Sequence, residues 1–143
     1  IILRNFKGGI DSMVEIAKND YYELSYDEND NIIFWVMRGF WKDMSAVPNF
    51  FSDWDKALKL TKPGWKIFSN ASQCRVVPPD VQEAKKKNQK RLLQNGCAKI
   101  VRIVDSAITK MSLSSEIKQP GMSAVIKEFS SDEIDEAIKW LRE

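Results

Sequence analysis

Trp65-Lys66-Ile67-Phe68 is a short apolar run, and Ser69-Asn70-Ala71-Ser72-Gln73-Cys74-Arg75-Val76-Val77-Pro78-Pro79-Asp80 follows it directly. The apolar run predicts a strand, and the segment after it predicts a loop that leads into a helix at Asp80. In an open α/β sheet, ligands and regulatory chemistry lie where a strand ends and a helix begins. We therefore look for function first in residues 69–80, which contain two prolines, two serines and a cysteine but no histidine.

Strand and helix patterns alternate on both sides of this junction. Upstream, two β-prone runs at residues 21–26 and 32–37 enclose a polar turn, which predicts a β-hairpin. Downstream, Asp80 and Glu83 fit a capping box, and Ser130 and Glu133 fit another before the last helix. The remaining patterns predict helices at 47–58 and around Ile108 and Met111, and strands at 98–104 and 122–129. The order predicts an α/β fold in one domain, an opening β-hairpin followed by alternating strands and helices in a mostly parallel sheet.

Composition excludes several classes of function. The chain has 143 residues, of which 22 are basic and 20 acidic, and this balance does not favour nucleic acid as a partner. No apolar run is long enough for an integral membrane segment. The absence of histidine removes Ser-His and Cys-His pairs and ordinary zinc sites, so we expect no catalytic residue, metal or cofactor.

The cysteines and the first residues suggest where the domain begins and where it resides. Cys74 and Cys97 are expected to be free thiols in a reducing compartment, which favours a cytoplasmic protein. Residues 1–12 precede Met13 and are expected to be an N-terminal extension, either native or added in cloning. The domain itself is then expected over residues 13–143.

The end of the chain carries a family resemblance. Phe129-Ser130-Ser131-Asp132-Glu133-Ile134-Asp135-Glu136-Ala137-Ile138-Lys139-Trp140-Leu141 combines a strand end, a serine-acid cap and Ala-x-x-Trp-Leu. Together with the helix that holds Phe51, Trp54 and Ala57, and with the order of elements from residue 21 onward, it resembles the STAS domains of the SpoIIAA-like group, the anti-sigma-factor antagonists. The resemblance implies a STAS/SpoIIAA-like fold and a non-enzymatic regulatory role through protein–protein interaction.

The junction at residues 77–80 departs from that family. The antagonists carry Asp-Ser-Ser-Gly or a similar sequence there, and one of the serines is phosphorylated. Here the matching residues are Val77-Pro78-Pro79-Asp80, so the usual phosphoacceptor serine is missing. Asp80 either supplies a fixed negative charge or simply caps the helix. We expect a protein partner or a homodimer at a surface that includes Ser69, Ser72, Arg75, Pro79 and Asp80.

Two other functions remain open. A carrier of a small apolar or lipid-like molecule would use an aromatic-lined pocket, for which the residues are Phe40, Trp41, Phe51 and Trp54. An enzyme would need two groups among its Asp, Ser, Lys and Cys side chains to converge in one pocket, and the spacing predicts none. The basic run of Lys85, Lys86, Lys87, Lys90 and Arg91 is expected to be a solvated helix face, with an acidic partner or lipid headgroups as the functional alternative.

Overall fold

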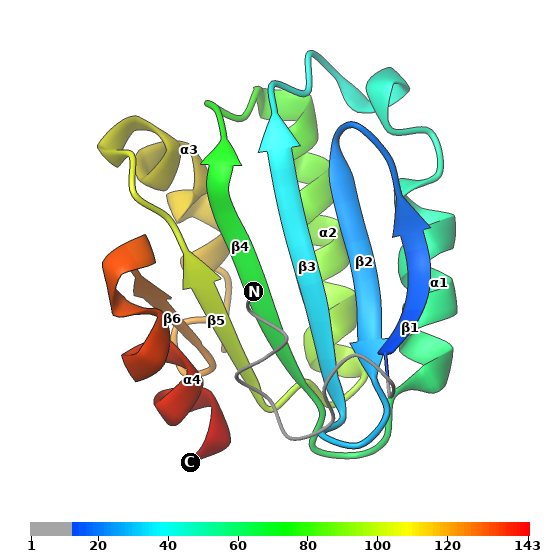
Figure 1. Ribbon diagram of the computed structural model, residues 1–143. Helices are drawn as coiled ribbons and strands as arrows, with labels where there is room; N and C mark the ends of the chain where they lie inside the picture. The colour runs from blue at the N-terminus through cyan, green and yellow to red at the C-terminus, as the bar shows by residue number, and fades with distance from the viewer. Residues whose placement is uncertain (1–12) are drawn as a thin grey trace.

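The computed structural model describes residues 13–143, which form a six-stranded mixed sheet with helices on both faces (Figure 1). The prediction for residues 1–12 lies outside the described residues. The strands are β1 (Met13–Lys18), β2 (Tyr22–Asp27), β3 (Ile32–Gly39), β4 (Lys66–Cys74), β5 (Lys99–Ile103) and β6 (Ile126–Phe129). The α-helices are α1 (Phe50–Leu60), α2 (Pro79–Gln94), α3 (Ala107–Ile117) and α4 (Ile134–Arg142), and the short 3-10 helices are η2 (Met44–Ala46) and η3 (Ser131–Glu133).

The strands lie in the sheet in the order of the chain, from β1 to β6. Strand β2 is antiparallel to both of its neighbours, β1 and β3, whereas β3, β4, β5 and β6 are parallel. The single α/β domain with its opening hairpin and mostly parallel sheet is therefore confirmed. The sequence predicted five strands, and β1 is the additional one. Within residues 13–143 it pairs with β2 alone, and its register shifts between Glu15 and Ala17.

The alternation of side chains along the central strands builds two cores. On β3, Ile33, Trp35 and Met37 belong to the larger core, which also contains buried residues of α1, α2 and α3. Ile32 and Phe34 face the opposite way and belong to a smaller core under α4. Figure 1 shows α1 and α2 behind the sheet and α4 in front of it. Both faces of β3 are thus apolar because each of them belongs to one of the two cores.

Helix α4 is fixed at both ends by contacts that the sequence predicted only in part. At its start, the predicted capping box of Ser130 and Glu133 is confirmed, and it opens η3 immediately before the helix. At its end, the Lys66 and Lys99 ammonium groups donate hydrogen bonds to the carbonyl oxygens of Leu141 and Trp140. Cations at a helix C-terminus satisfy carbonyl groups that lack a helical partner and complement the helix dipole.

The first half of the predicted loop at residues 69–80 is a strand. Strand β4 continues to Cys74 despite polar residues with low β propensity, because it pairs with β5 as far as Asn70 and with β3 as far as Cys74. Helix α2 begins at Pro79 with Pro78 as its N-cap, so the prediction of Asp80 as N-cap was wrong. The Asp80 carboxylate instead accepts a hydrogen bond from the Met44 backbone N–H at 3.1 Å and ties η2 to α2.

Candidate functional site

At the carboxyl ends of the parallel strands, the segments that follow β3, β4 and β5 lie close together. The backbone N–H of Arg75 donates to the Gly39 carbonyl at 3.0 Å, which places the end of β4 beside the end of β3. The Thr109 hydroxyl donates to the Cys74 carbonyl at 3.1 Å, and the Ser112 hydroxyl accepts from the Val77 N–H at 3.1 Å. Helix α3 is therefore held against the connection from β4 to α2.

Exposed apolar side chains gather at this end of the sheet. Among the described residues, five large apolar side chains are exposed: Phe40 (46%), Leu60 (37%), Val76 (46%), Ile108 (68%) and Met111 (75%). Four of them follow the carboxyl ends of β3, β4 and β5, and only Leu60 lies at the opposite end, next to the Lys62 carbonyl that bonds Asn31. We call Phe40, Arg75, Val76, Ile108 and Met111 the carboxyl-end surface.

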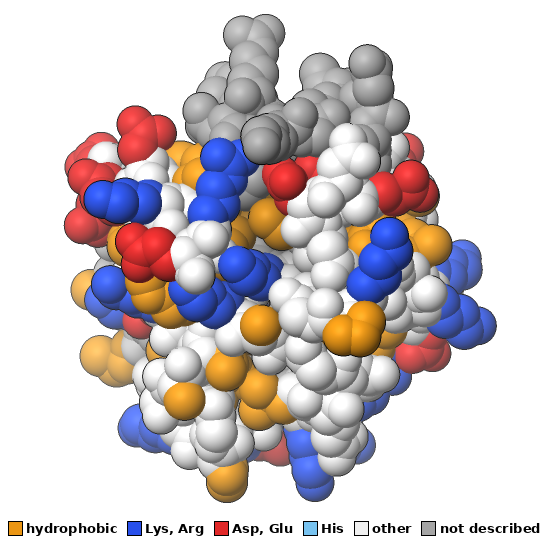
Figure 2. Space-filling model, turned by 90° about the horizontal axis from the view of Figure 1, so that it is seen from below, with side chains coloured by type: hydrophobic (Ala, Val, Ile, Leu, Met, Phe, Trp, Pro, Cys, Tyr) orange, Lys and Arg blue, Asp and Glu red, His pale blue; other side chains and the backbone are white. Residues whose placement is uncertain are grey.

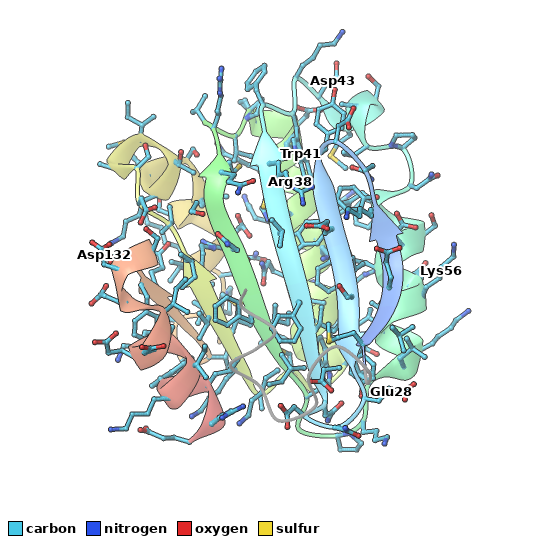
Figure 3. All side chains as sticks on the ribbon, in the orientation of Figure 1. Glu28, Arg38, Trp41, Asp43, Lys56 and Asp132 are labelled. Atoms are coloured by element: carbon cyan, nitrogen blue, oxygen red, sulfur yellow. The ribbon has the colours of Figure 1, made fainter. Side chains whose placement is uncertain are left out.

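The figures place the two ends relative to each other. Figure 3 shows Trp41 and Asp43 near the end of β3, whereas Glu28 lies at the far end of the sheet. Figure 2 views the molecule from that far end, where hydrophobic side chains and charged side chains of both signs are visible. Of the five large exposed apolar side chains of the described residues, only Leu60 lies at that end.

Ile108 and Met111 are functional candidates that the sequence did not identify as such. Their spacing located α3 correctly, but the helix buries Thr109, Leu113 and Glu116 and leaves Ile108 and Met111 exposed. The buried face contains a glutamate and a threonine, so apolar periodicity assigns the wrong side of this helix to the core.

Two cations flank the exposed apolar groups. The side chains of Lys42 and Arg75 are exposed, and neither forms an ion pair or a hydrogen bond within residues 13–143. The nearby carboxylates are engaged: Asp43 accepts from the Ser45 N–H at 2.8 Å, and Asp80 accepts from Met44. The two side-chain hydrogen bonds to Ser45 hold the pKa of Asp43 below its usual value. The carboxyl-end surface thus offers positive charge to a partner.

The structure separates the five residues predicted to bind a partner. Arg75, Pro79 and Asp80 are exposed at the carboxyl end of the sheet. Ser69 lies within β4, is 7% exposed and lines an internal cavity. Ser72 is half-buried and donates its hydroxyl proton to Asn70 Oδ1 at 2.7 Å. Only the first three are available to another molecule.

The four predicted pocket residues do not share a pocket. Trp41 and Trp54 are both 2% exposed and belong to a packed aromatic cluster, with ring centroids 6.0 Å apart for Trp41 and Phe50 and 5.1 Å apart for Trp35 and Trp54. Phe51 is half-buried and lies against the Arg91 guanidinium, 5.4 Å from the ring centroid. Phe40 is exposed on the surface. The packed aromatic cluster that contains Trp41 and Trp54 fills the space between β3 and α1.

A buried polar cluster lies under α2, where the sequence predicted a solvated face. Lys85 is 5% exposed, and its ammonium nitrogen lies 3.6 Å from Glu116 Oε1. The same oxygen accepts hydrogen bonds from Arg102 Nη2 at 3.0 Å and from Gln89 Nε2 at 2.9 Å. Arg102 also approaches Glu128, with Nη1 and Oε2 3.6 Å apart. Burial lowers the pKa of Lys85, and the Glu116 carboxylate partly opposes this effect.

This cluster borders a small cavity. Ser69, Lys85, Asn88, Gln89 and Arg102 form its polar wall, and Trp35, Phe50, Trp54, Ile67, Leu92 and Ile100 form its apolar wall. Its volume available to a water centre is about 20 Å³. This is room for a single water molecule, whereas ligand pockets measure roughly 300–1,000 Å³. Ser69 and Lys85 thus converge, as an enzyme would require, but on a space too small for a substrate.

The two cysteines are free and buried. Burial raises the pKa of the Cys74 thiol, and it raises the pKa of Cys97 to about 12. Reactive cysteines have a depressed pKa and partial exposure. Neither thiol has the properties of a nucleophile or a redox sensor.

Comparison with known proteins adds no relative to this description. No family model, no curated protein and no solved structure matches the chain. Within residues 13–143, no three side chains of the His, Cys, Asp and Glu types are grouped so that they could hold a metal ion. In the same residues, no helix has the length and apolarity needed to cross a membrane.

Proposed function

We propose that the chain is a non-enzymatic regulatory module of the STAS, SpoIIAA-like type, acting in the cytoplasm, and that it binds a protein partner through the carboxyl-end surface. One observation carries the proposal: four of the five large exposed apolar side chains of the described residues lie together at the strand ends. Exposed apolar groups that cluster in this way mark interaction sites, whereas scattered ones need no explanation.

The partner of this surface has a definable chemistry. Phe40 and Met111 project apolar area, and aromatic and Met side chains are enriched in protein interfaces. Arg75 and Lys42 offer two cations that have no partner within the described residues. We therefore assign to the partner an apolar segment that carries carboxylates, since electrostatic complementarity selects partners and orients them.

This mode of binding does not use the serine switch of the resembling family. Val77, Pro78, Pro79 and Asp80 provide no hydroxyl group at the start of α2, and the Asp80 carboxylate is used to hold η2. Ser69 is buried, so a kinase would not reach it in the folded protein. The proposed binding therefore does not depend on phosphorylation of these residues.

The carrier function has weaker support. Such a protein needs a cavity of the size of its ligand, and the cavity beside Trp54 has room for only about one water molecule. The aromatic residues predicted to line the pocket pack against one another instead. The filled space between β3 and α1 favours a surface interaction over internal storage.

The test is a selection from a random peptide library displayed on phage, with the wild-type chain as bait. We expect enriched peptides to combine apolar and acidic residues, and to lose binding at least tenfold to Met111→Asp and to Arg75→Glu. Leu60→Asp is the matched control, because it changes an exposed apolar residue at the opposite end. Peptides that bind all three variants equally, or a library without enrichment, would reject the proposed surface.

The same variants also test self-association, which is the alternative to binding a separate partner protein. Sedimentation velocity over a range of concentrations measures it directly. A wild-type dimer that Met111→Asp dissociates, together with a selection that yields no peptide, would replace the partner protein by a second copy of this chain.

A further inference from the structure

The cavity between α1, α2 and the sheet contains polar atoms that no described residue satisfies. Trp54 Nε1, Asn88 Oδ1 and Gln89 Oε1 are buried and have no hydrogen-bond partner. The three residues are 2%, 3% and 8% exposed, and all three line the same cavity. A buried polar group without a partner costs about 1–3 kcal/mol, so native proteins rarely leave three of them around one space.

The orientation of one of these groups is fixed. Gln89 Nε2 donates to Glu116 Oε1 at 2.9 Å. A reversed amide would bring its carbonyl oxygen against the carboxylate, so Gln89 Oε1 must be the atom that remains for the cavity. This atom requires a donor, whereas the Trp54 indole N–H requires an acceptor.

These requirements distinguish between possible occupants. A halide would accept from Trp54 but would face the carbonyl oxygen of Gln89. A monovalent cation would suit Asn88 and Gln89 but would face the Trp54 N–H and lie beside Lys85 and Arg102, which line the same wall. Water both donates and accepts, and the available volume of about 20 Å³ fits one molecule.

We propose that this cavity is a hydration site for one internal water molecule, which accepts from Trp54 Nε1 and donates to Asn88 Oδ1 and Gln89 Oε1. The water connects α1, through Trp54, to α2, through Asn88 and Gln89. It lies beside Lys85 and Arg102, whose charges Glu116 and Glu128 balance. The site is independent of the carboxyl-end surface and of the function proposed for it.

The first test uses the indole protons of the native protein. Water–protein cross-relaxation in a sample labelled with ¹⁵N at the tryptophans is expected to show a long-lived water contact at the Trp54 indole, which Trp54→Phe identifies by the loss of its resonance. Trp65 is the internal control, because its indole donates to the Asn95 carbonyl at 2.8 Å. A visible Trp54 indole without a water contact would overturn the proposal.

The second test identifies the occupant. A high-resolution crystal structure is expected to show one density peak within hydrogen-bonding distance of Trp54 Nε1 and Gln89 Oε1. Crystals soaked in bromide are expected to show no anomalous signal at that peak. An anomalous bromide peak there, or a cavity without density, would rule the water out.

Discussion

Replacement of Glu116 by glutamine tests how the buried charges are balanced. Glu116 is fully buried and accepts two hydrogen bonds, one of them from the Arg102 guanidinium. Glu116→Gln keeps the shape but removes the charge that faces Lys85 and Arg102. Hydrogen bonds to charged groups contribute about 1.5–3 kcal/mol each, and removal of one member of a buried ion pair costs about 3–5 kcal/mol. Because the amide oxygen still accepts one bond and Arg102 keeps Glu128, we expect a loss of about 2–4 kcal/mol in the free energy of unfolding.

The decisive measurement is a double-mutant cycle with Lys85→Met. In the wild type, this change removes one of the two cations that face Glu116; because Arg102 remains, it is expected to cost less than the roughly 3–5 kcal/mol of a pair left without any partner. In the Glu116→Gln background it removes a buried cation that has lost its nearest carboxylate, so it is expected to be neutral or stabilising. Urea unfolding followed by tryptophan fluorescence gives each free energy.

A matched control is available on the same helix. Lys86 pairs with Glu83 at 2.8 Å, but the Glu83 side chain is 68% exposed. Lys86→Met is expected to change stability by less than about 0.5 kcal/mol in both backgrounds. If Lys85→Met and Glu116→Gln add within about 0.5 kcal/mol, the two charges are not coupled and the reasoning fails.

Three further predictions concern stability. Burial raises the pKa of Cys97 from 9.0 to about 12, so the folded state favours the neutral thiol. The stability that this preference contributes is complete below pH 9 and is lost as the pH rises from 9 toward 12. Between pH 9 and about pH 10.5 the wild type should lose about 2 kcal/mol more of its free energy of unfolding than Cys97→Ala does. Urea midpoints that shift equally with pH in the two proteins would contradict this. Asn31 has a φ of 56°, so Asn31→Ala should be about 1 kcal/mol less stable than Asn31→Gly in thermal unfolding, and the reverse order would show that this backbone strain is not decisive. Ser130→Ala should cost about 1 kcal/mol by removing the capping box before α4, and an unchanged melting temperature would count against it.

Local patterns were sufficient for most of the fold. The α/β class and the opening hairpin follow from strands and helices that alternate along the chain, and the last capping box was predictable from Ser130 and Glu133 alone. The order of the strands within the sheet was not predicted, because the same alternation is compatible with several orders. Strand β1 was missed because an edge strand with half-exposed residues lacks strong alternation. The length of β4 was missed because residues 69–74 are mostly polar, and the pairing that keeps them extended, with β3 as far as Cys74 and with β5 as far as Asn70, is not local.

The partner-binding surface stays a prediction, and the structure shows only which of its residues are accessible. Arg75, Pro79 and Asp80 are exposed near the strand ends. The burial of Lys85 could not be foreseen, because its partner Glu116 lies on another helix and the pairing depends on tertiary structure. For the same reason Ile108 and Met111 face outward: the inner side of α3 is occupied by Glu116, which completes the buried charge cluster.

The sequential order of the strands also bears on how the chain reaches its folded state. Each new strand joins the free edge of those already formed, and no strand has to be inserted between two earlier ones. The antiparallel pairs β1–β2 and β2–β3 close short turns, whereas each parallel pair must first close a crossover that contains a helix. The hairpin end of the sheet therefore has the lower entropic barrier, and the edge with β6 and α4, which completes the second core, depends on the longer closures.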